Sequence, residues 1–353
     1  MGSLDEQAVH ALAEQAGVGP VQAVAPLIGG ANNRVFRLET AAGEFLLKSY
    51  FRHPDDSRDR LGAEFAFAHF AWNQEVRCIP QPLACDAAAG LGLFEFVFGR
   101  SMKGTVAGEP AVDQAIDFFR ALNRAREQPE AVNLLRASES CLSLDDHFNT
   151  VNCRVERLHM LPVGAEVDRA AASFVESKLV PTWRQVLAAA RAAAAALGLA
   201  IDGPLTASDC CLSPSDFGFH NAILANDGRL RFIDFEYAGW DDPSKLICDF
   251  FCQPAVPAPA HSFERFAHAI AAEFPNSAIH LARTALLLPV YRVKWVCIML
   301  NEFLPVGGSR RAFSGTLTER ETRKTSQLAK ARAALAAVIA DCHGGRPLQT
   351  KAA

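Results

Sequence analysis

The stretch Ser213-Pro-Ser-Asp-Phe-Gly-Phe-His-Asn221, with Phe232-Ile-Asp-Phe-Glu-Tyr237 after it, decides how this chain is interpreted. Asp216 and Asn221 share a loop, and Asp234 follows a hydrophobic strand-like run further on. Each residue alone has an ordinary explanation, because Asp and Asn commonly form turns. In this order and spacing, they predict a phosphoryl-transfer site. One carboxylate would accept the proton of the attacking hydroxyl, while an amide oxygen and a second carboxylate would hold Mg²⁺.

The composition indicates a globular protein and argues against several partners. The 353 residues are 50% hydrophobic with a formal net charge of −4, and no basic run stands out, so we expect no nucleic-acid partner. The 10 cysteines form no C-x-x-C pair, which predicts free thiols and a cytoplasmic location. The N-terminus lacks the features of a signal peptide. The apolar stretch 284–300 contains Pro289, Arg292 and Lys294, so we expect a buried helix there and no membrane span.

The hydrophobic patterning predicts a β-rich part followed by a helical part. Before Gly99, the pattern predicts a short helix at 4–16, two hairpins, and a helix at 58–75 between them. Helical spacing after Gly99 predicts helices at 111–136, 165–198, 261–273, 278–303 and 317–342. The segment 205–236 is the exception, with short strand-like runs on either side of a turn.

The two quoted segments resemble the phosphotransferase family that includes aminoglycoside phosphotransferases and choline and ethanolamine kinases. That family has a catalytic loop of the form His-Gly-Asp-x-x-x-x-Asn followed by a metal-binding Ile-Asp-[Phe/Trp] segment. The resemblance implies that Asp216 is the catalytic residue and that Asn221 and Asp234 are metal ligands. It also implies an α+β, protein-kinase-like bilobal fold. Residues 1–98 would form a nucleotide-binding lobe, a small antiparallel sheet with one helix, and residues 99–353 a larger, mainly helical catalytic and substrate-binding lobe.

The catalytic loop departs from the family pattern at two positions. Pro214 and Ser215 stand where the family has His and Gly. Because the family His braces the loop, the bracing here must come from another group, with Ser213 and Ser215 as candidates. The resemblance further implies that Asp249 is structural and bonds backbone amides of the catalytic region.

Nucleotide-binding residues are expected in the N-terminal part. The backbone of Gly29, Gly30 and Asn32 could approach phosphates, although a Gly-Gly pair before a strand is also an ordinary turn. By resemblance, Lys48 on the next strand contacts the α- and β-phosphates of ATP and pairs with Glu64 on the following helix.

The run 93–99 resembles the strand and hinge that join the two lobes in the family. By this resemblance, the adenine of ATP would bond backbone groups near Glu95 and Val97. An ordinary buried strand is the alternative.

The residues that hold the acceptor are left open by the sequence. Tyr237, Trp240, Tyr291 and Trp295 could form an aromatic cage for a quaternary ammonium, or belong to the core. Arg154 and Arg157 could bind an anion, or lie on an exposed helix face. The residues that we select as acceptor candidates are Glu236, which could touch metal or substrate, Trp240, Trp295, Asn301 and Glu302.

Taken together, the residues and the resemblance predict an ATP- and Mg²⁺-dependent transfer of the γ-phosphate to a hydroxyl of a small molecule. A sugar or sugar derivative is the favoured acceptor. The alternatives are a choline- or ethanolamine-type kinase and a pseudokinase that binds nucleotide without turnover.

Overall fold

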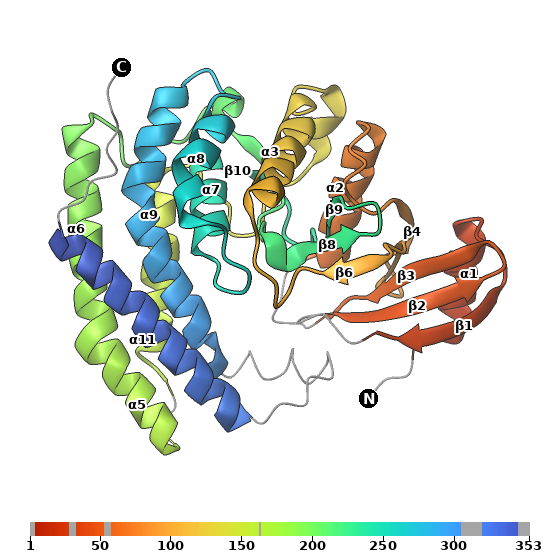
Figure 1. Ribbon diagram of the computed structural model, residues 1–353, viewed down its shortest axis with the longest axis horizontal. Coiled ribbons are helices and arrows are strands. Elements are labelled where there is room, and N and C mark those ends of the chain that lie inside the picture. The colour runs from red at the N-terminus through yellow and green to blue at the C-terminus, as the bar shows by residue number, and fades with distance from the viewer. Residues whose placement is uncertain (1–3, 28–32, 53–57, 162–163, 305–319, 345–353) are drawn as a thin grey trace.

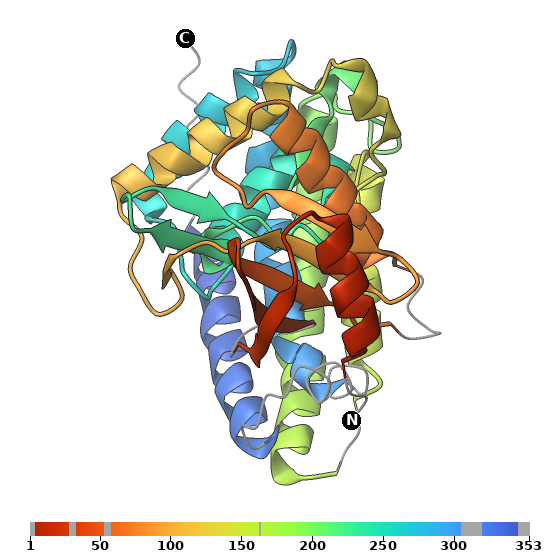
Figure 2. The same cartoon turned by 90° about the vertical axis from the view of Figure 1, so that its right-hand side faces the viewer.

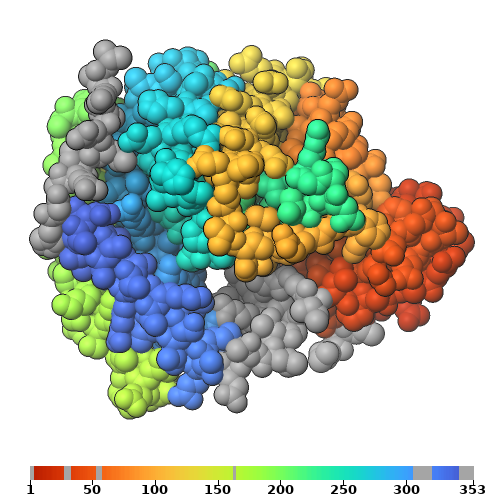
Figure 3. Space-filling view, viewed as in Figure 1, coloured from red at the N-terminus to blue at the C-terminus, as the bar shows by residue number. Residues whose placement is uncertain are grey.

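The computed structural model describes residues 4–27, 33–52, 58–161, 164–304 and 320–344. These residues form a small β-rich part and a larger helical part (Figure 1). In the space-filling view the N-terminal strands project from one side of the larger body (Figure 3). The predicted glycine-loop residues Gly29, Gly30 and Asn32 lie outside the described residues.

A five-stranded antiparallel sheet of order β1-β2-β3-β5-β4 forms the N-terminal part. Its strands are β1 (Val21–Pro26), β2 (Arg34–Thr40), β3 (Gly43–Ser49), β4 (Pro82–Asp86) and β5 (Leu91–Glu95). On the central strand β3, Leu47 is fully buried in the core of this part. Because side chains alternate along a strand, the next residue, Lys48, is directed to the opposite face of the sheet.

Two helices accompany this sheet among the described residues. Helix α1 (Glu6–Gln15) begins at its N-cap Asp5 and packs Val9 and Leu12 into the sheet core (Figure 2). Helix α2 (Arg60–Asn73) is capped by Asp59, whose carboxylate accepts a hydrogen bond from the Gly62 N–H at 2.9 Å. Helix α2 contacts β4 and β5, so Glu64 of this helix lies against the sheet that contains Lys48.

The larger part is mainly helical, with short strands around the two quoted segments. Its helices are α3 (Glu109–Arg124), α4 (Leu144–Leu158), α5 (Glu166–Phe174), α6 (Val180–Ala196), α7 (Pro243–Cys252), α8 (Phe263–Ala271), α9 (Ser277–Met299) and α11 (Arg320–Gly344). A π-helical turn, η2 (Val175–Leu179), joins α5 to α6, and short 3-10 turns are η1 (Pro129–Asn133), η3 (Ala207–Asp209), η4 (Phe219–Asn221), η5 (Ala260–Ser262) and η6 (Leu300–Phe303). The strands are β6 (Gly99–Ser101), β7 (Cys211–Ser213), β8 (Ala222–Ala225), β9 (Leu230–Phe232) and β10 (Gly239–Asp241).

The sequence-based prediction of helices was wrong in two places: one predicted helix was too long, and one helix was not predicted. The helix predicted over 111–136 ends at Arg124, because Pro129 disfavours helical geometry in the residue before it and cannot donate a backbone hydrogen bond. Helix α4 was missed, although Ser143 and Asp146 form a capping box at its start. The predicted division into lobes at residues 98 and 99 stays a prediction; β6, which starts at Gly99, pairs with β8 of the larger part.

Helix α9 lies at the centre of the helical part and contacts α4, α6, α7, α8 and α11 (Figure 1). By length and composition alone, Ser277–Phe303 is apolar enough to cross a membrane, but 67% of its most apolar window is buried inside the protein. The segment packs as the core helix that the interruptions by Arg292 and Lys294 predicted.

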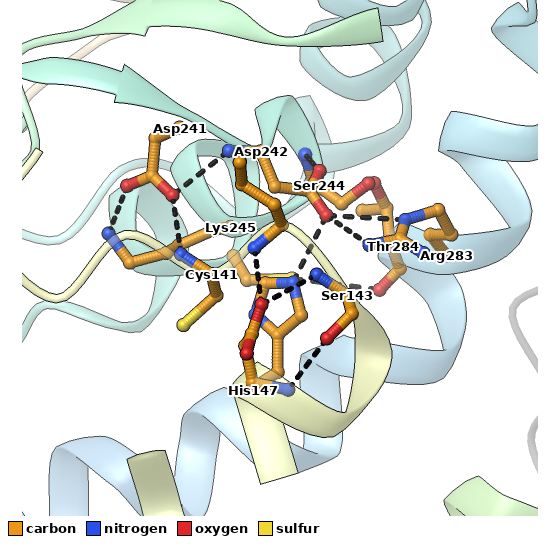
Figure 4. Close-up of polar contacts among 12 residues, drawn as sticks. Cys141, Ser143, His147, Asp241, Asp242, Ser244, Lys245, Arg283 and Thr284 are labelled. Atoms are coloured by element: carbon orange, nitrogen blue, oxygen red, sulfur yellow. Dashed lines mark hydrogen bonds and ion pairs between the residues drawn. The ribbon is translucent and has the colours of Figure 1, made fainter. Parts of the chain in front are cut away.

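A buried polar network ties α4, α7, α9 and β10 together (Figure 4). The Asp242 carboxylate lies 3.0 Å from Nε2 of His147 and accepts hydrogen bonds from Arg283 at 2.6 and 3.2 Å. The Asp241 carboxylate accepts hydrogen bonds from the N–H groups of Cys141 and Asp242. Burial favours neutral groups, so charges placed this deep are retained only where each has a partner.

Candidate active site

The catalytic-loop segment 213–221 and the following segment 232–237 are flanked by strands that pair with each other. Strands β7 and β10 pair Ser213 with Gly239, and β8 and β9 pair Ala222 with Phe232. The loop that carries Asp216 and the segment that carries Asp234 therefore start and finish side by side. Gly239 is required at one of these ends, because a Cβ there would lie 2.3 Å from the carbonyl oxygen of Leu135, and its φ is +156°.

A cluster of buried phenylalanines packs against the same two segments. Phe217 follows Asp216, and Phe232 lies two residues before Asp234. The ring centroids of these two phenylalanines are 5.4 Å apart, and the ring of Phe118 from α3 stacks on Phe232 at 4.7 Å. Phe235 packs against Phe67 of α2 at 5.1 Å. Each of these rings is buried. The apolar residues that alternate with the polar ones thus anchor Asp216 and Asp234 to one core.

The loop before Asp216 is braced by Ser213, one of the two candidates from the sequence. The buried Ser213 hydroxyl accepts a hydrogen bond from the Ser215 N–H at 3.0 Å, and the Asp216 N–H donates to the carbonyl of Pro214 at 2.9 Å. Ser215 has a φ of +65°, in the left-handed region, where the family pattern has Gly. The turn is therefore fixed by backbone groups and one hydroxyl.

Two side chains orient the carboxylate of Asp216. Nε2 of His220 lies 3.1 Å from Oδ1, and Nδ2 of Asn221 donates to Oδ2 at 3.2 Å and to the Asp216 carbonyl at 3.0 Å. Burial alone would raise the pKa of Asp216, but the hydrogen bonds from His220 and Asn221 outweigh it and lower the pKa. Asp216 is therefore ionised at neutral pH and can accept a hydrogen bond from a hydroxyl group.

Asp234 connects this loop to the N-terminal sheet. The Ile233 N–H donates to the Asn221 carbonyl at 2.9 Å, which holds the two segments together. Asp234 has a φ of +71°, and its Oδ1 lies 2.9 Å from Nζ of Lys48. Left-handed backbone geometry in a non-glycine residue is strained and concentrates at functional sites.

Lys48 lies between two carboxylates from different elements. Its Nζ donates to both oxygens of Glu64 at 2.8 Å, and Tyr50 donates to Oε2 of Glu64 at 2.7 Å. Burial would lower the pKa of Lys48, but Asp234 and Glu64 together raise it, so the ammonium stays charged. Burial raises the pKa of Glu64 against the opposing effect of Lys48. The pairing that the resemblance implied for Lys48 and Glu64 is present.

Glu236, a candidate for metal or substrate contact, instead links the two parts of the protein. It is buried, its Oε2 accepts a hydrogen bond from Nδ2 of Asn33 at 2.8 Å, and Nε of Arg60 lies 3.6 Å away. Asn33 precedes β2, and Arg60 begins α2. These contacts support a structural role for Glu236 beside the site.

Of the two residues predicted to bond adenine at the hinge, one already uses its backbone N–H. The Glu95 N–H donates to the Gln81 carbonyl at 2.8 Å, and Oε2 of Glu95 accepts from the Gln81 N–H at 3.1 Å. Within the described part of the chain, no hydrogen bond uses the N–H of Val97. Val97 therefore offers a donor at the hinge, whereas Glu95 has its donor occupied.

Three acceptor candidates of the helical part, Trp240, Trp295 and Glu302, have side chains engaged in protein contacts. Trp240 donates its indole N–H to the Ala131 carbonyl at 3.0 Å, and Trp295 donates to Oδ1 of Asp249 at 2.8 Å. Asn301 and Glu302 lie on η6, where Glu302 is buried and its Oε1 lies 3.1 Å from Nε of Arg323. None of these contacts joins them to Asp216.

The resemblance implied that Asp249 bonds backbone amides, and the structure corrects this expectation. Its carboxylate bonds side chains, Nζ of Lys294 at 2.8 and 3.0 Å and the indole of Trp295, and accepts no backbone amide within the described residues. The amide-binding role belongs to Asp241 instead. Asp249 acts by holding Lys294, whose charge lowers the pKa of Asp216.

Sequence reasoning missed three groups at the site. His220 was detectable as a polar side chain four residues after Asp216 and next to Asn221. Tyr50 was detectable by strand alternation, since it lies two residues after Lys48. Glu139 gave no signal: it has a φ of +59° and pairs with Arg154 of α4, and it is linked to Asp216 by the charge of Lys294, which lowers the pKa of both carboxyl groups.

The residues present fit a magnesium ion shared with a nucleotide. Nδ2 of Asn221 is used toward Asp216, so its Oδ1 is available as a ligand, and Asp234 retains a side chain that is 33% exposed. The described residues contain no group of three or more His, Cys, Asp or Glu that could hold a metal. Mg²⁺ is usually held by one or two carboxylates plus phosphate and water oxygens, so no such group is needed.

A family model described as the phosphotransferase enzyme family matches residues 23–295. No curated protein sequence matches the chain significantly. A choline/ethanolamine kinase family protein from Mesorhizobium loti is 19% identical with a TM-score of 0.55, covering 95% of this chain and 99% of its own. The choline kinase from Streptococcus pneumoniae is 15% identical (TM-score 0.57, coverage 95% and 100%). Spectinomycin phosphotransferase with ADP and spectinomycin is 11% identical (TM-score 0.54, coverage 93% and 98%). These likenesses confirm the expected kinase-like α+β fold.

Proposed function

Because this chain belongs to the phosphotransferase enzyme family, we propose that it transfers the γ-phosphate of ATP, in the presence of Mg²⁺, to a hydroxyl group of a small molecule. The observation that carries this proposal is the convergence of Lys48, Asp216, Asn221 and Asp234, which come from both parts of the protein. A cytoplasmic location belongs to the same proposal and is supported by the described cysteines, which are all free.

Each converging side chain has a role that suits its surroundings. Asp216 is ionised and oriented, so it can align the acceptor hydroxyl and take its proton. Lys48 stays charged and can bind the phosphates, with Glu64 and Asp234 fixing its position. Asn221 and Asp234 would hold Mg²⁺, which when bound neutralises negative charge on the triphosphate. The free N–H of Val97 can donate to the adenine ring.

The described contacts favour an uncharged, hydroxylated acceptor, such as a sugar or sugar derivative, over a quaternary ammonium compound. Tyr291 is fully buried with its hydroxyl 2.7 Å from His147 Nδ1, and Arg58 and Arg60 already lie over the ring of Tyr237. Together with the engaged indoles of Trp240 and Trp295, these contacts show that the four aromatic candidates are used within the protein and do not form a preformed cage.

The charges near Asp216 support the same acceptor class. Lys294 contributes a positive charge to the surroundings of both Asp216 and Glu139. Burial would raise the pKa of Glu139, but Arg154 and Lys294 lower it to about 2. Groups of both signs are present, which disfavours a polycation, and carboxylate and guanidinium groups can bond neutral hydroxyls.

The test is a phosphate-transfer screen with ATP and Mg²⁺ over sugars, amino alcohols, nucleosides and aminoglycosides, with ADP release and the phosphorylated product both measured. We expect transfer to at least one hydroxylated acceptor and a loss of about 10²- to 10⁴-fold in the Asp216→Asn variant. ATP binding without transfer or hydrolysis by the wild type would instead identify a nucleotide-binding pseudokinase.

A further inference from the structure

We propose that His220 is the positioning residue for Asp216, donating a hydrogen bond from Nε2 to Oδ1 so that the carboxylate faces the acceptor hydroxyl. The inference rests on the proposed phosphotransferase function and adds a residue to it. His220 lies in η4, immediately before Asn221, and its side chain is 13% exposed. Its Nε2 lies 3.1 Å from Oδ1 of Asp216.

The surroundings of the imidazole determine which nitrogen carries the proton. Nδ1 of His220 is buried and has no hydrogen-bond partner within the described part of the chain. A proton on Nδ1 would be a buried donor without an acceptor, which is energetically unfavourable. The neutral tautomer with its proton on Nε2 avoids that cost and gives Asp216 a donor.

The donors available to the Asp216 carboxylate are few. Among the described residues, only His220 and Asn221 donate hydrogen bonds to its two oxygens. Pro214, two residues before Asp216, has no N–H to donate. Asn221 reaches Oδ2, so Oδ1 depends on His220. Two donors on different oxygens fix the rotation of the carboxylate, which one donor would leave free.

The imidazole is also held by close packing against the loop itself. A Cβ on Gly218 would lie 2.8 Å from Nδ1 of His220, 3.0 Å from its Cε1 and 3.2 Å from Cγ of Gln253. Gln253 is buried, and its side-chain oxygen accepts hydrogen bonds from Ala255 and Val256, so it has little freedom to move. With a φ of 170°, Gly218 is extended, so a larger residue there would act through crowding, most closely of the imidazole and less closely of Gln253, and not through backbone strain.

The first experiment compares His220→Leu, which removes the donor, with His220→Gln, whose amide can reach the position of Nε2. We expect His220→Leu to lower kcat by about 10- to 100-fold with the KM for ATP unchanged, because misplacing a reacting group costs this much. His220→Gln should recover most of the loss. Equal kcat in both variants, whether at the wild-type value or reduced in parallel with the Tm, would overturn the inference.

A double-mutant cycle with Asp216→Asn separates positioning from general stability. Since His220 acts through the Asp216 carboxylate, adding His220→Leu to Asp216→Asn should cause no further loss of kcat. Losses that multiply would show that His220 acts independently of Asp216 and contradict the proposal.

Gly218→Ala provides a second route that leaves His220 in place. The added methyl group should displace the imidazole and lower kcat in the same direction as His220→Leu. Gly108→Ala is the matched control, because its Cβ would meet only Pro110 at 3.7 Å and should leave kcat unchanged. Wild-type kcat in Gly218→Ala would overturn the inference.

The outcomes for the inference and for the proposed function are distinct. A wild-type protein that transfers phosphate while His220→Leu is equally active refutes the inference alone. A wild-type protein that neither transfers phosphate nor hydrolyses ATP refutes the proposed function, and the inference with it.

Discussion

The ammonium of Lys48 lies 2.9 Å from Oδ1 of Asp234, although 186 residues separate them in the chain. The contact joins the central strand of the N-terminal sheet to the segment after β9. Lys48 is buried and also bonds Glu64 of α2, so three elements meet at one ammonium group. The candidate site is therefore an interface between the two parts of the protein, and changes at it should affect stability and activity together.

Replacing Lys48 with Met should cost about 3–5 kcal/mol in the free energy of unfolding, because Glu64 would be left buried without its partner. The double variant Lys48→Met/Glu64→Gln should recover part of this cost, since no buried charge remains on that pair. Urea unfolding measures both. A Lys48→Met variant as stable as the wild type would contradict the described pairing.

Glu236→Gln should destabilise the protein by about 3–5 kcal/mol, because the buried charge interaction between Glu236 and Arg60 is lost. The KM for the acceptor should not change in the folded variant if the role of Glu236 is structural. Glu264→Gln, on an exposed position of α8, is the control and should stay within about 0.5 kcal/mol of the wild type. A raised acceptor KM with unchanged stability would restore Glu236 as a substrate ligand.

Glu139→Gln and Arg154→Met should raise the KM for the acceptor by roughly 10-fold or more while leaving the KM for ATP unchanged, because a hydrogen bond to a charged group contributes about 1.5–3 kcal/mol. Arg157→Met supplies the control, since Arg157 is exposed on the same helix, α4. Steady-state kinetics with the acceptor identified by the screen measures all three. Equal effects at positions 154 and 157 would argue against an acceptor site here.

Stability should fall as pH rises from about 6.5 to 9 because of His147. Burial lowers the pKa of this residue, but Cys141 and the hydrogen bond to Asp242 outweigh it and raise the pKa to about 9. A pKa that is higher in the folded state stabilises the protein below the unfolded value and loses that effect as pH rises through the folded value.

The free energy of unfolding should fall by about 3 kcal/mol over this range, because the pKa of His147 is raised from its ordinary value to about 9 in the folded protein. Urea unfolding at pH 6.5 and pH 9 should show a larger decrease for the wild type than for His147→Gln. Cys141 is the thiol that raises the pKa of His147, and the other buried thiols are present in both proteins, so their contribution is the same in the comparison. The same decrease in both would show that His147 does not carry the pH dependence.

Much of the fold could be predicted because local patterns specify it. The helix at residues 4–16 and the one at 58–75 appear as α1 and α2 with small shifts at their ends. The helix at 111–136 was overextended, because α3 ends before the turn that contains Pro129. Helix α4 was missed although a capping box marks its start and its buried apolar residues recur at helical spacing: Leu144, Phe148, Val151, Val155 and Leu158.

The sequence by itself determined which residue types are present for phosphoryl transfer, because the spacing of Asp216, Asn221 and Asp234 is a property of one short stretch of chain. The long-range partners at and around the site were decided by the tertiary structure alone: Lys48 on Asp234, Asn33 and Arg60 on Glu236, and Lys294 on Asp249. The physical reason is that a side chain's protonation and orientation depend on the groups packed around it. Most of those groups come from distant segments that meet only when the cores close.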